Sequence, residues 1–330
     1  MRDKKRVLSG MRPTGPLHMG NYLGALNNWV DMQDQYDCFF FVADWHALTS
    51  DYEKPGPMGD YVRNILMDWL SAGLSPDKCT IFVQSKVPEH SELYLVFSMI
   101  TPVPWLERNP TYKDQIVQLQ NKDLSTFGFL GYPVLQAADI LIYKAQGVPV
   151  GIDQVPHVEI TREIARRFNY LYGQIFPEPE AILTQTPKIL GLDRRKMSKS
   201  YDNAIYLSDG PEEIRAKVMQ MVTDPQRARK SDPGDPDVCN VFEFHKLYTD
   251  KETVQQINAQ CRSADIGCVA CKKIMAENLI KAMAPLHERR QYYQSHPKVV
   301  EEIMNEGSRR ARQTAVETMR QVRSAVKIDY

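Results

Sequence analysis

The sequence predicts an α/β protein built on an open, doubly wound parallel sheet, followed by a smaller all-helical region. Short apolar runs of strand length alternate with segments of helical periodicity through the first half of the chain, which indicates parallel βαβ units. After residue 200 the strand-like runs fade. The 330 residues, 43% of them hydrophobic, are enough to fill two cores. We therefore expect a Rossmann-type domain over residues 1–202 and a helical domain over residues 203–330, whose last helix can pack back on the first domain.

The individual elements follow from the apolar pattern. Apolar runs predict buried strands at residues 6–9, 38–44, 79–84 and 148–150. Apolar residues at three- and four-residue steps predict helices at residues 17–30, 54–72, 133–144 and 155–172. From about residue 211 onward we expect helices separated by polar loops, such as the Asp-Pro-Gly-Asp-Pro loop at 232–236.

Charge and composition exclude several classes of protein. Lys+Arg and Asp+Glu both number 41, so any binding of a nucleic acid requires a local basic face. The basic start of the chain leads into a short, interrupted apolar run, which does not resemble a secretory signal. The apolar run at 38–43 is far too short to span a bilayer. We expect a cytoplasmic protein without a membrane segment, whose six cysteines are thiols or ligands.

A first phosphate-binding signature occupies residues 16–21, directly after the first predicted strand. A strand, a turn and a helix beginning near Leu17 would direct backbone N–H groups and the positive end of the helix towards an anion. His18 and Asn21 lie three residues apart, so both can donate to one phosphate, and Gly20 permits close approach of a nucleotide. When this pattern is taken alone, an ordinary β-turn-α unit with a capping histidine explains it equally well.

A second signature, Lys196-Met197-Ser198-Lys199-Ser200, lies roughly 180 residues further along. Its two lysines, preceded by Arg194 and Arg195, predict a mobile cationic loop. Such a loop can stabilise pyrophosphate as it leaves ATP and gains negative charge. A solvated basic loop is the alternative that composition alone would favour.

In this order the two signatures resemble the pair with which class I aminoacyl-tRNA synthetases hold ATP. Residues 9–25 resemble the tryptophanyl-tRNA synthetases more narrowly, and the likeness extends to the last helix. The resemblance implies that His18, Asn21, Lys196 and Lys199 are catalytic and that Mg²⁺ accompanies ATP. It implies further nucleotide contacts at Arg12, Pro13, Thr14, Gly20, Gly151, Ile152, Asp153, Ile189, Met197, Ser198 and Ser200.

A third group of residues points to the amino acid that is activated. Tyr132, Gln136 and Asp139 fall on one face of a predicted helix. A buried aspartate needs a donor, and both an indole N–H and a phenol O–H are donors, so tryptophan and tyrosine both remain possible on this motif. Tyr132 and Gln136 can hold the substrate's α-ammonium group.

The resemblance favours tryptophan. Asn21 stands where tyrosyl enzymes usually carry a second histidine, and residues 44–49 resemble the tryptophanyl motif whose histidine, here His46, lines the indole pocket. By the same resemblance Asp139 accepts the indole N–H, and Gln154 lies beside the amino acid. The segment from Gly151 to Gln154 directly follows a predicted strand, where doubly wound sheets bind ligands.

Four cysteines in the predicted helical domain suggest a metal centre. Cys239, Cys261, Cys268 and Cys271 have the spacing Cys-x21-Cys-x6-Cys-x2-Cys. Four thiolates can bind zinc or a 4Fe–4S cluster, and a single Cys-x-x-Cys with two isolated cysteines favours the cluster. Some tryptophanyl-tRNA synthetases carry such a cluster on similar spacing, with a first gap one residue longer, which makes Cys239 the least certain ligand.

The predicted function is ATP-dependent activation of L-tryptophan and its transfer to tRNA(Trp). The alternatives are a tyrosyl-tRNA synthetase and a non-catalytic, tRNA-binding paralogue. The resemblance also implies a homodimer with tRNA across both subunits and a helical domain that reads the anticodon. Five arginines crowd the last helical stretch and are either an RNA-binding face or a solvated helix surface, namely Arg309, Arg310, Arg312, Arg320 and Arg323.

Overall fold

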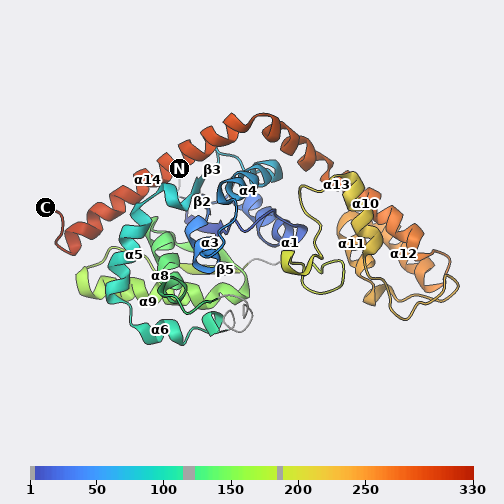
Figure 1. Cartoon of the computed structure of the whole chain (residues 1–330), viewed down its shortest axis with the longest axis horizontal. Coiled ribbons are helices and arrows are strands. Elements are labelled where there is room, and N and C mark those ends of the chain that lie inside the picture. Colours follow the sequence, from blue (N-terminus) through green and yellow to red (C-terminus); the bar gives the residue numbers. More distant parts are fainter. Residues whose placement is uncertain (1–3, 114–122, 184–188) are drawn as a thin grey trace. The chain divides into compact units, whose positions relative to one another are not determined.

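The computed structural model describes residues 4–113, 123–183 and 189–330 (Figure 1). The chain divides into two compact units. A sheet unit comprises Met1–Gly15, Asn28–Gln185 and His296–Tyr330, and a helical unit comprises Pro16–Asn27 and Thr186–Ser295. This division differs from the boundary expected after residue 202, because a segment close to the amino terminus and residues before 202 join the helical unit.

The sheet unit contains five parallel strands in the order β3-β2-β1-β4-β5. The order reverses beside β1, which makes this a doubly wound sheet with its switch point between β1 and β4. The predicted fold class is therefore confirmed. The strands are β1 (Arg6–Met11), β2 (Asp37–Val42), β3 (Cys79–Val83), β4 (Gly147–Val150) and β5 (Glu180–Leu183).

The fifth strand was not predicted. β5 has four residues at the edge of the sheet, and its two end residues, Glu180 and Leu183, are exposed. A short, half-exposed edge strand lacks the continuous apolar run by which buried parallel strands are recognised. The second predicted strand is shorter than expected, since β2 ends at Val42 and a helix begins at Asp44.

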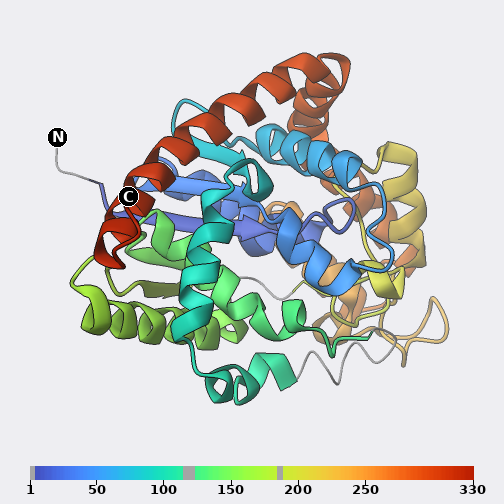
Figure 2. The same cartoon turned by 60° about the vertical axis from the view of Figure 1, so that its left-hand side comes forward.

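Helices cover both faces of the sheet (Figures 1 and 2). The helix predicted at 133–144 starts earlier, at Phe127, because the Thr126 side chain caps it by accepting a hydrogen bond from the Phe129 N–H. Between the helices and the sheet, aromatic rings fill the core, and Trp29 stacks on Phe40 with ring centroids 4.6 Å apart. Before the last helix of the chain, the helices that the described residues of this unit form are α2 (Asn27–Met32), α3 (Asp44–Asp51), α4 (Met58–Ala72), α5 (Glu89–Ile100), α6 (Val103–Glu107), α8 (Phe127–Ile142) and α9 (Val155–Tyr172), with short 3₁₀ turns η2 (Gln84–Lys86) and η3 (Ile152–Gln154).

The last helix, α14 (Pro297–Ala325), belongs to the sheet unit and packs against the edge strand β3 (Figure 2). Gly307 permits this contact, since a Cβ atom there would lie 1.8 Å from the carbonyl oxygen of Ile81. The next residue, Ser308, accepts a hydrogen bond from the Val83 N–H at 3.4 Å. A helix that covers an edge strand protects it from pairing with another chain.

The arginines of α14 form contacts within the sheet unit. Arg312 pairs with Glu89 at 2.9 Å and Arg323 pairs with Glu92 at 2.5 Å, which ties α14 to α5. Arg310 donates to the carbonyl oxygen of Pro76 at 2.7 Å. Together with the intrahelical pairs Arg309–Glu306 and Arg320–Glu317, these contacts favour a structural role over an RNA-binding face.

The helical unit is held together by α13 (Cys268–Ser295), which packs against α10 (Pro211–Gln220) and α11 (Asn240–Tyr248). The segment around α1 (Met19–Asn21) joins it through backbone hydrogen bonds from the Met19 N–H to the Ile205 oxygen and from the Leu207 N–H to the Leu17 oxygen. The unit also contains η1 (Tyr22–Leu26), η4 (Lys199–Tyr201), η5 (Pro236–Val238) and α12 (Lys251–Arg262). Over the described ranges of both units, no helix has the length and apolar character required to cross a membrane.

Candidate active site and cysteine cluster

Asp139, on α8, is fully buried in the sheet unit and accepts three hydrogen bonds. His46, from α3, contacts Oδ2 through Nε2 at 2.7 Å. On Oδ1, the Gln84 amide donates at 2.8 Å and His90 contacts through Nδ1 at 2.5 Å. Burial alone would raise the pKa of Asp139, but the charges and hydrogen bonds of His46 and His90 outweigh it, so the pKa is lowered. The site therefore holds a carboxylate anion inside an apolar core.

The structure brings Asp139 together with His46, as the resemblance implied, and adds two residues that the sequence reasoning missed. Gln84 begins η2 directly after β3, and His90 is the second residue of α5. Both are completely buried polar side chains near the carboxyl end of a strand. A polar residue at the end of the strand predicted over 79–84 was the available signal for Gln84, whereas His90 carried none.

Tyr132, also on α8, is the last member of a chain of hydrogen bonds that runs from Asn109 through His157. The Thr111 N–H donates to Oδ1 of Asn109 at 2.9 Å, which leaves the Asn109 amide nitrogen to donate to Nδ1 of His157 at 3.3 Å. Burial above all lowers the pKa of His157 to about 4, so the ring is neutral and its Nε2–H donates to the Tyr132 oxygen at 3.0 Å. His157 and Asn109, which sequence reasoning missed, thus fix the rotation of the Tyr132 hydroxyl.

The remaining sheet-unit residues predicted for the site lie at the carboxyl ends of β1 and β4, except for Gln136 on α8. Gln136 is half-buried on α8. After β4, a Cβ at Gly151 would lie 2.7 Å from Oδ1 of Asp153, so glycine permits the tight turn into η3. Ile152 and Asp153 are exposed there, and the Gln154 amide donates to Asp153 at 2.9 Å. After β1, Arg12 and Thr14 are exposed and Pro13 is buried. The ends of adjacent strands at a switch point are where doubly wound sheets bind ligands.

In the helical unit, His18 and Asn21 form a reciprocal cap at the start of α1. The Asn21 N–H donates to Nδ1 of His18 at 3.3 Å, and the His18 N–H donates to Oδ1 of Asn21 at 3.1 Å. Burial, followed by the charges of Lys199 and Lys196, lowers the pKa of His18 to about 4. A neutral ring that accepts at Nδ1 carries its proton on Nε2, so the His18 Nε2–H and the Asn21 amide nitrogen remain as donors for an anion. This is the donor pair that the sequence predicted.

The lysine loop is anchored beside this cap. Met197 is buried, and the Ser198 N–H donates to Oδ1 of Asn203 at 2.8 Å, while the Asn203 amide donates to Asp193 at 2.7 Å. Lys196 is exposed, Lys199 is half-buried at the start of η4, and Ser200 follows it. Since both lysines act on the pKa of His18, the two phosphate-binding signatures lie together in one unit.

Two predicted nucleotide contacts of the helical unit are Gly20, which has a further local explanation, and Ile189. A Cβ at Gly20 would lie 2.9 Å from Nδ1 of His18, so glycine is needed there for the cap itself. Ile189 is half-buried at the beginning of the helical unit. Contacts of either residue with a nucleotide remain predictions.

The four predicted ligand cysteines all lie in the helical unit and influence one another. Burial, then the charges of the other three, raises the pKa of Cys271 to about 12, and burial also raises the pKa values of Cys239 and Cys261, to which Cys268 contributes. Nη1 of Arg227 lies 3.7 Å from the sulfur of Cys261 and 4.0 Å from that of Cys268. Among the residues that the structure describes, no three His, Cys, Asp or Glu side chains are grouped as ligands of a metal ion. The chemistry of the donor set, four thiols with Arg227 beside two of them, is that of a thiolate-bound centre.

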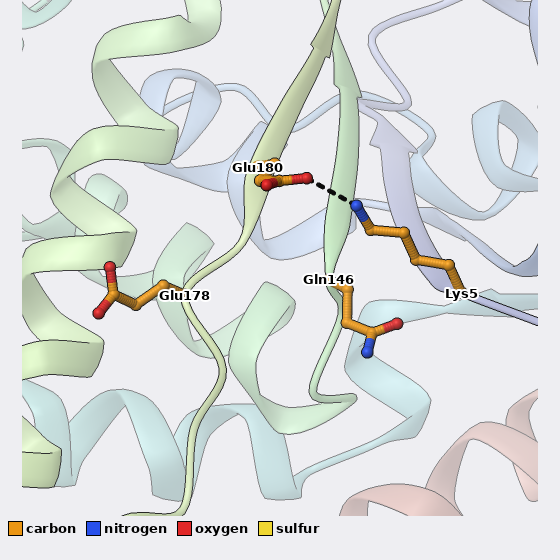
Figure 3. A pocket seen from close by; sticks show the side chains of 4 residues that line it. All are labelled: Lys5, Gln146, Glu178 and Glu180. Carbon is orange, nitrogen blue, oxygen red and sulfur yellow. Dashed lines mark hydrogen bonds and ion pairs between the residues drawn. The ribbon is translucent and has the colours of Figure 1, made fainter.

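A separate hollow of about 420 Å³ lies at the amino ends of the strands (Figure 3). It is lined by Lys5, Gln146, Glu178 and Glu180. Lys5 forms an ion pair with Glu180 at 2.6 Å, and Glu178 forms one with Arg166 at 2.7 Å. Its charges are therefore balanced within the chain, and it lies at the opposite end of the sheet from the residues discussed above.

Comparison with known families agrees with this geometry. A family model described as tRNA synthetases class I (W and Y) matches residues 1–284, which include β1 to β5, the lysine loop and all four cysteines. The chain belongs to this family. It is thus a class I aminoacyl-tRNA synthetase.

Curated relatives of this synthetase match it over almost its whole length. The tryptophan–tRNA ligase of Thermotoga maritima is 52% identical and the alignment covers 98% of this chain and all of the relative. The tryptophan–tRNA ligase of Aquifex aeolicus is 46% identical, with 98% of this chain and all of the relative covered.

Solved structures with this fold include synthetases for tryptophan and for tyrosine. The tryptophanyl-tRNA synthetase of Campylobacter jejuni in complex with ADP and tryptophan superimposes with a TM-score of 0.89 at 34% identity, covering 98% of this synthetase and 99% of that chain. The tyrosyl-tRNA synthetase of Archaeoglobus fulgidus shares the fold at 18% identity, with a TM-score of 0.66 over 88% of this chain and 90% of that one. The fold alone therefore does not distinguish the two substrates.

Proposed function

We propose that this synthetase is a tryptophan–tRNA ligase, which activates L-tryptophan with ATP and transfers it to tRNA(Trp). The observation that carries this conclusion is the sequence identity, 46% and 52% over nearly the full chain, to two relatives named tryptophan–tRNA ligases. The buried carboxylate of Asp139, which needs a donor from its ligand, is consistent with the indole ring.

The sheet unit recognises the amino acid. Asp139 accepts the indole N–H, and His46 lines the indole pocket. Tyr132 and Gln136 hold the α-ammonium group, and Gln154 lies beside the amino acid. A pocket built around a buried acceptor discriminates strongly against a substrate that lacks the donor, because the acceptor would then be left unpaired. Phenylalanine is rejected on this ground.

The helical unit acts on the phosphates. In the first step a carboxylate oxygen of tryptophan attacks the α-phosphorus of ATP, and the bond to the pyrophosphate oxygen breaks. The neutral His18 donates through Nε2 and Asn21 through its amide as charge develops, while Lys196 and Lys199 stabilise the departing pyrophosphate. Mg²⁺, when bound, neutralises phosphate charge.

Further nucleotide contacts are proposed from the sequence resemblance, namely Arg12, Pro13, Thr14, Gly20, Gly151, Ile152, Asp153, Ile189, Met197, Ser198 and Ser200. In the second step a hydroxyl of the terminal ribose of tRNA attacks the carbonyl carbon of tryptophanyl-adenylate, and AMP leaves. No covalent enzyme intermediate is needed, so catalysis depends on positioning and electrostatic stabilisation.

Pyrophosphate exchange into ATP tests the assignment. Exchange that depends on L-tryptophan is expected, and exchange that depends on L-tyrosine instead would show the substrate to be wrong. No exchange with either amino acid, from protein that binds tRNA, would indicate the non-catalytic paralogue.

We also propose a 4Fe–4S cluster bound by Cys239, Cys261, Cys268 and Cys271, with zinc as the alternative. The electrostatic influence among the four cysteines and the position of Arg227 beside Cys261 and Cys268 support the site, and the single Cys-x-x-Cys supports the cluster over zinc. When bound, the cluster supplies a cross-link between four separated points of the helical unit.

Anaerobically purified protein tests the metal centre. We expect brown protein with about four irons and four sulfides per chain, and Cys268→Ser should bleach it and loosen the helical unit while tryptophan activation survives better than tRNA charging. Stoichiometric zinc without iron would reject the cluster, and protein without any bound metal would reject the site.

We further propose that the enzyme is a cytoplasmic homodimer. An exposed apolar patch on α5 and α6 supports a second copy as the partner: Leu95, Met99 and Val103 are 56%, 73% and 51% exposed. Sedimentation of the wild type and of Met99→Glu tests this. A monomeric wild type that charges tRNA normally would contradict the dimer.

A further inference from the structure

The buried polar group around Asp139 extends one residue further than its direct contacts. His90 contacts Asp139 through Nδ1, and its other ring nitrogen, Nε2, lies 2.7 Å from the hydroxyl oxygen of Tyr143. Tyr143 directly follows α8. Neither Tyr143 nor His90 has any exposed surface. The rings of Phe41 and Phe82 lie 6.3 and 6.2 Å from His90, so these contacts form inside an apolar core.

The direction of each hydrogen bond follows from its partners. Asp139 is an anion and can only accept, so the Nδ1–H of His90 donates to it. Burial, then the charges of Asp139 and Glu89, raises the pKa of Tyr143 well above its usual value, so its hydroxyl keeps its proton. The other ring nitrogen of His90, Nε2, is engaged by the Tyr143 hydroxyl at 2.7 Å, so both nitrogens of the ring have a buried partner. Tyr143 thereby holds the His90 ring in one orientation.

The hydrogen bonds to Asp139 leave part of its acceptor capacity unused. An ionised carboxylate has about four acceptor sites, two on each oxygen. On Asp139, Oδ1 accepts from Gln84 and His90, so both of its sites are used. Among the described residues, Oδ2 accepts from His46 alone, which leaves one site. The carboxylate is thus held in one orientation with a single acceptor direction still available.

We propose that His90, fixed by Tyr143, is a positioning residue for tryptophan selection: it saturates Oδ1 of Asp139 so that the remaining acceptor site on Oδ2 meets the indole N–H. This inference rests on the proposed function. Second partners of this kind fix the orientation of a ligand-binding group and are needed for its selectivity. Without His90 the carboxylate can rotate or recruit water, and a substrate without a ring N–H is no longer penalised to the same extent.

The test is pyrophosphate exchange by the full chain with L-tryptophan and with the analogue whose ring N–H is replaced by sulfur, β-(3-benzothienyl)-L-alanine. The quantity compared is the ratio of kcat/KM for the two substrates. His90→Leu should lower this ratio roughly tenfold, mainly through a higher KM for tryptophan, and leave the KM for ATP within about twofold. His90→Asn, which keeps an N–H near the position of Nδ1, should restore most of the ratio.

Two further variants separate positioning from mere packing. Phe97→Leu alters a fully buried residue on the same helix, α5, and should reduce stability without changing the ratio. Tyr143→Phe removes a single oxygen and should lower the ratio roughly threefold, so it decides the question if His90→Leu does not fold. A wild-type ratio in both Tyr143→Phe and folded His90→Leu overturns the inference. A wild type without tryptophan-dependent exchange would instead reject the proposed function itself, before any variant is compared.

Discussion

Replacing Gly307 by alanine should separate α14 from the edge strand β3. An ideal Cβ at Gly307 would lie 1.8 Å from the carbonyl oxygen of Ile81 and 2.8 Å from its carbonyl carbon. Since an ordinary carbon–oxygen contact is about 3.3 Å, the helix or the strand has to move by roughly 1.5 Å. The carbonyl group belongs to the strand backbone and cannot rotate away as a flexible side chain would.

The size of the effect is the difference between two opposing contributions. Overpacking of this kind destabilises by about 1–3 kcal/mol. Alanine in place of glycine within a helix stabilises the helix by up to about 1 kcal/mol, because its helix propensity is higher. The displacement also weakens the hydrogen bond from the Val83 N–H to Ser308 at 3.4 Å. We expect a net loss of about 2 kcal/mol, or roughly 4–8 °C in the melting temperature of the sheet unit.

Thermal unfolding followed by circular dichroism measures the loss, and limited proteolysis shows whether α14 is released first. Gly59→Ala is the matched control, because Gly59 is an exposed helical glycine whose added Cβ would meet only Arg63 Nη1, at 3.7 Å. The control should be as stable as the wild type or slightly more stable. If Gly307→Ala melts with the control, the close contact between α14 and β3 does not exist in solution.

Three further predictions concern the site and its pH dependence. Lys199→Ala should slow single-turnover adenylate formation roughly 100-fold or more and leave tryptophan affinity unchanged, and an unaltered rate would remove the loop from the mechanism. Asp139→Asn should weaken tryptophan use and relax discrimination against analogues without a ring N–H; undiminished discrimination in exchange assays would contradict its role as acceptor. Burial first of all lowers the pKa values of His18, His157 and His245 from 6.5 to about 4, so the unfolded chain takes up protons below pH 6.5 that the folded chain refuses. The free energy of unfolding should therefore be greatest above pH 6.5 and should fall by about 2 kcal/mol per histidine at pH 5. Denaturant titrations measure this, and an equal free energy of unfolding at pH 7 and pH 5 would refute the neutral histidines.

The class of fold could be predicted correctly from the sequence, and the sequence also supplied candidate residues for the site. Four of the five strands contain a short apolar run, because a parallel strand buried on both faces needs apolar side chains. The phosphate-binding signatures and the pair of Asp139 and His46 could be recognised because each is a short pattern or belongs to one. The edge strand β5 escaped notice, since half-exposed residues leave no such pattern.

Only the tertiary structure decided which distant residues complete the site and where the compact units divide. His90 reaches Asp139 across 49 positions of the chain, and the segment around Met19 joins residues near 205 through backbone hydrogen bonds. Neither contact has a sequence period, because hydrogen bonds between elements depend on how the chain is folded back and not on local spacing. The same holds for Gly307, which reads as an unfavourable helix residue until the carbonyl group of Ile81 is seen to occupy the space of a side chain.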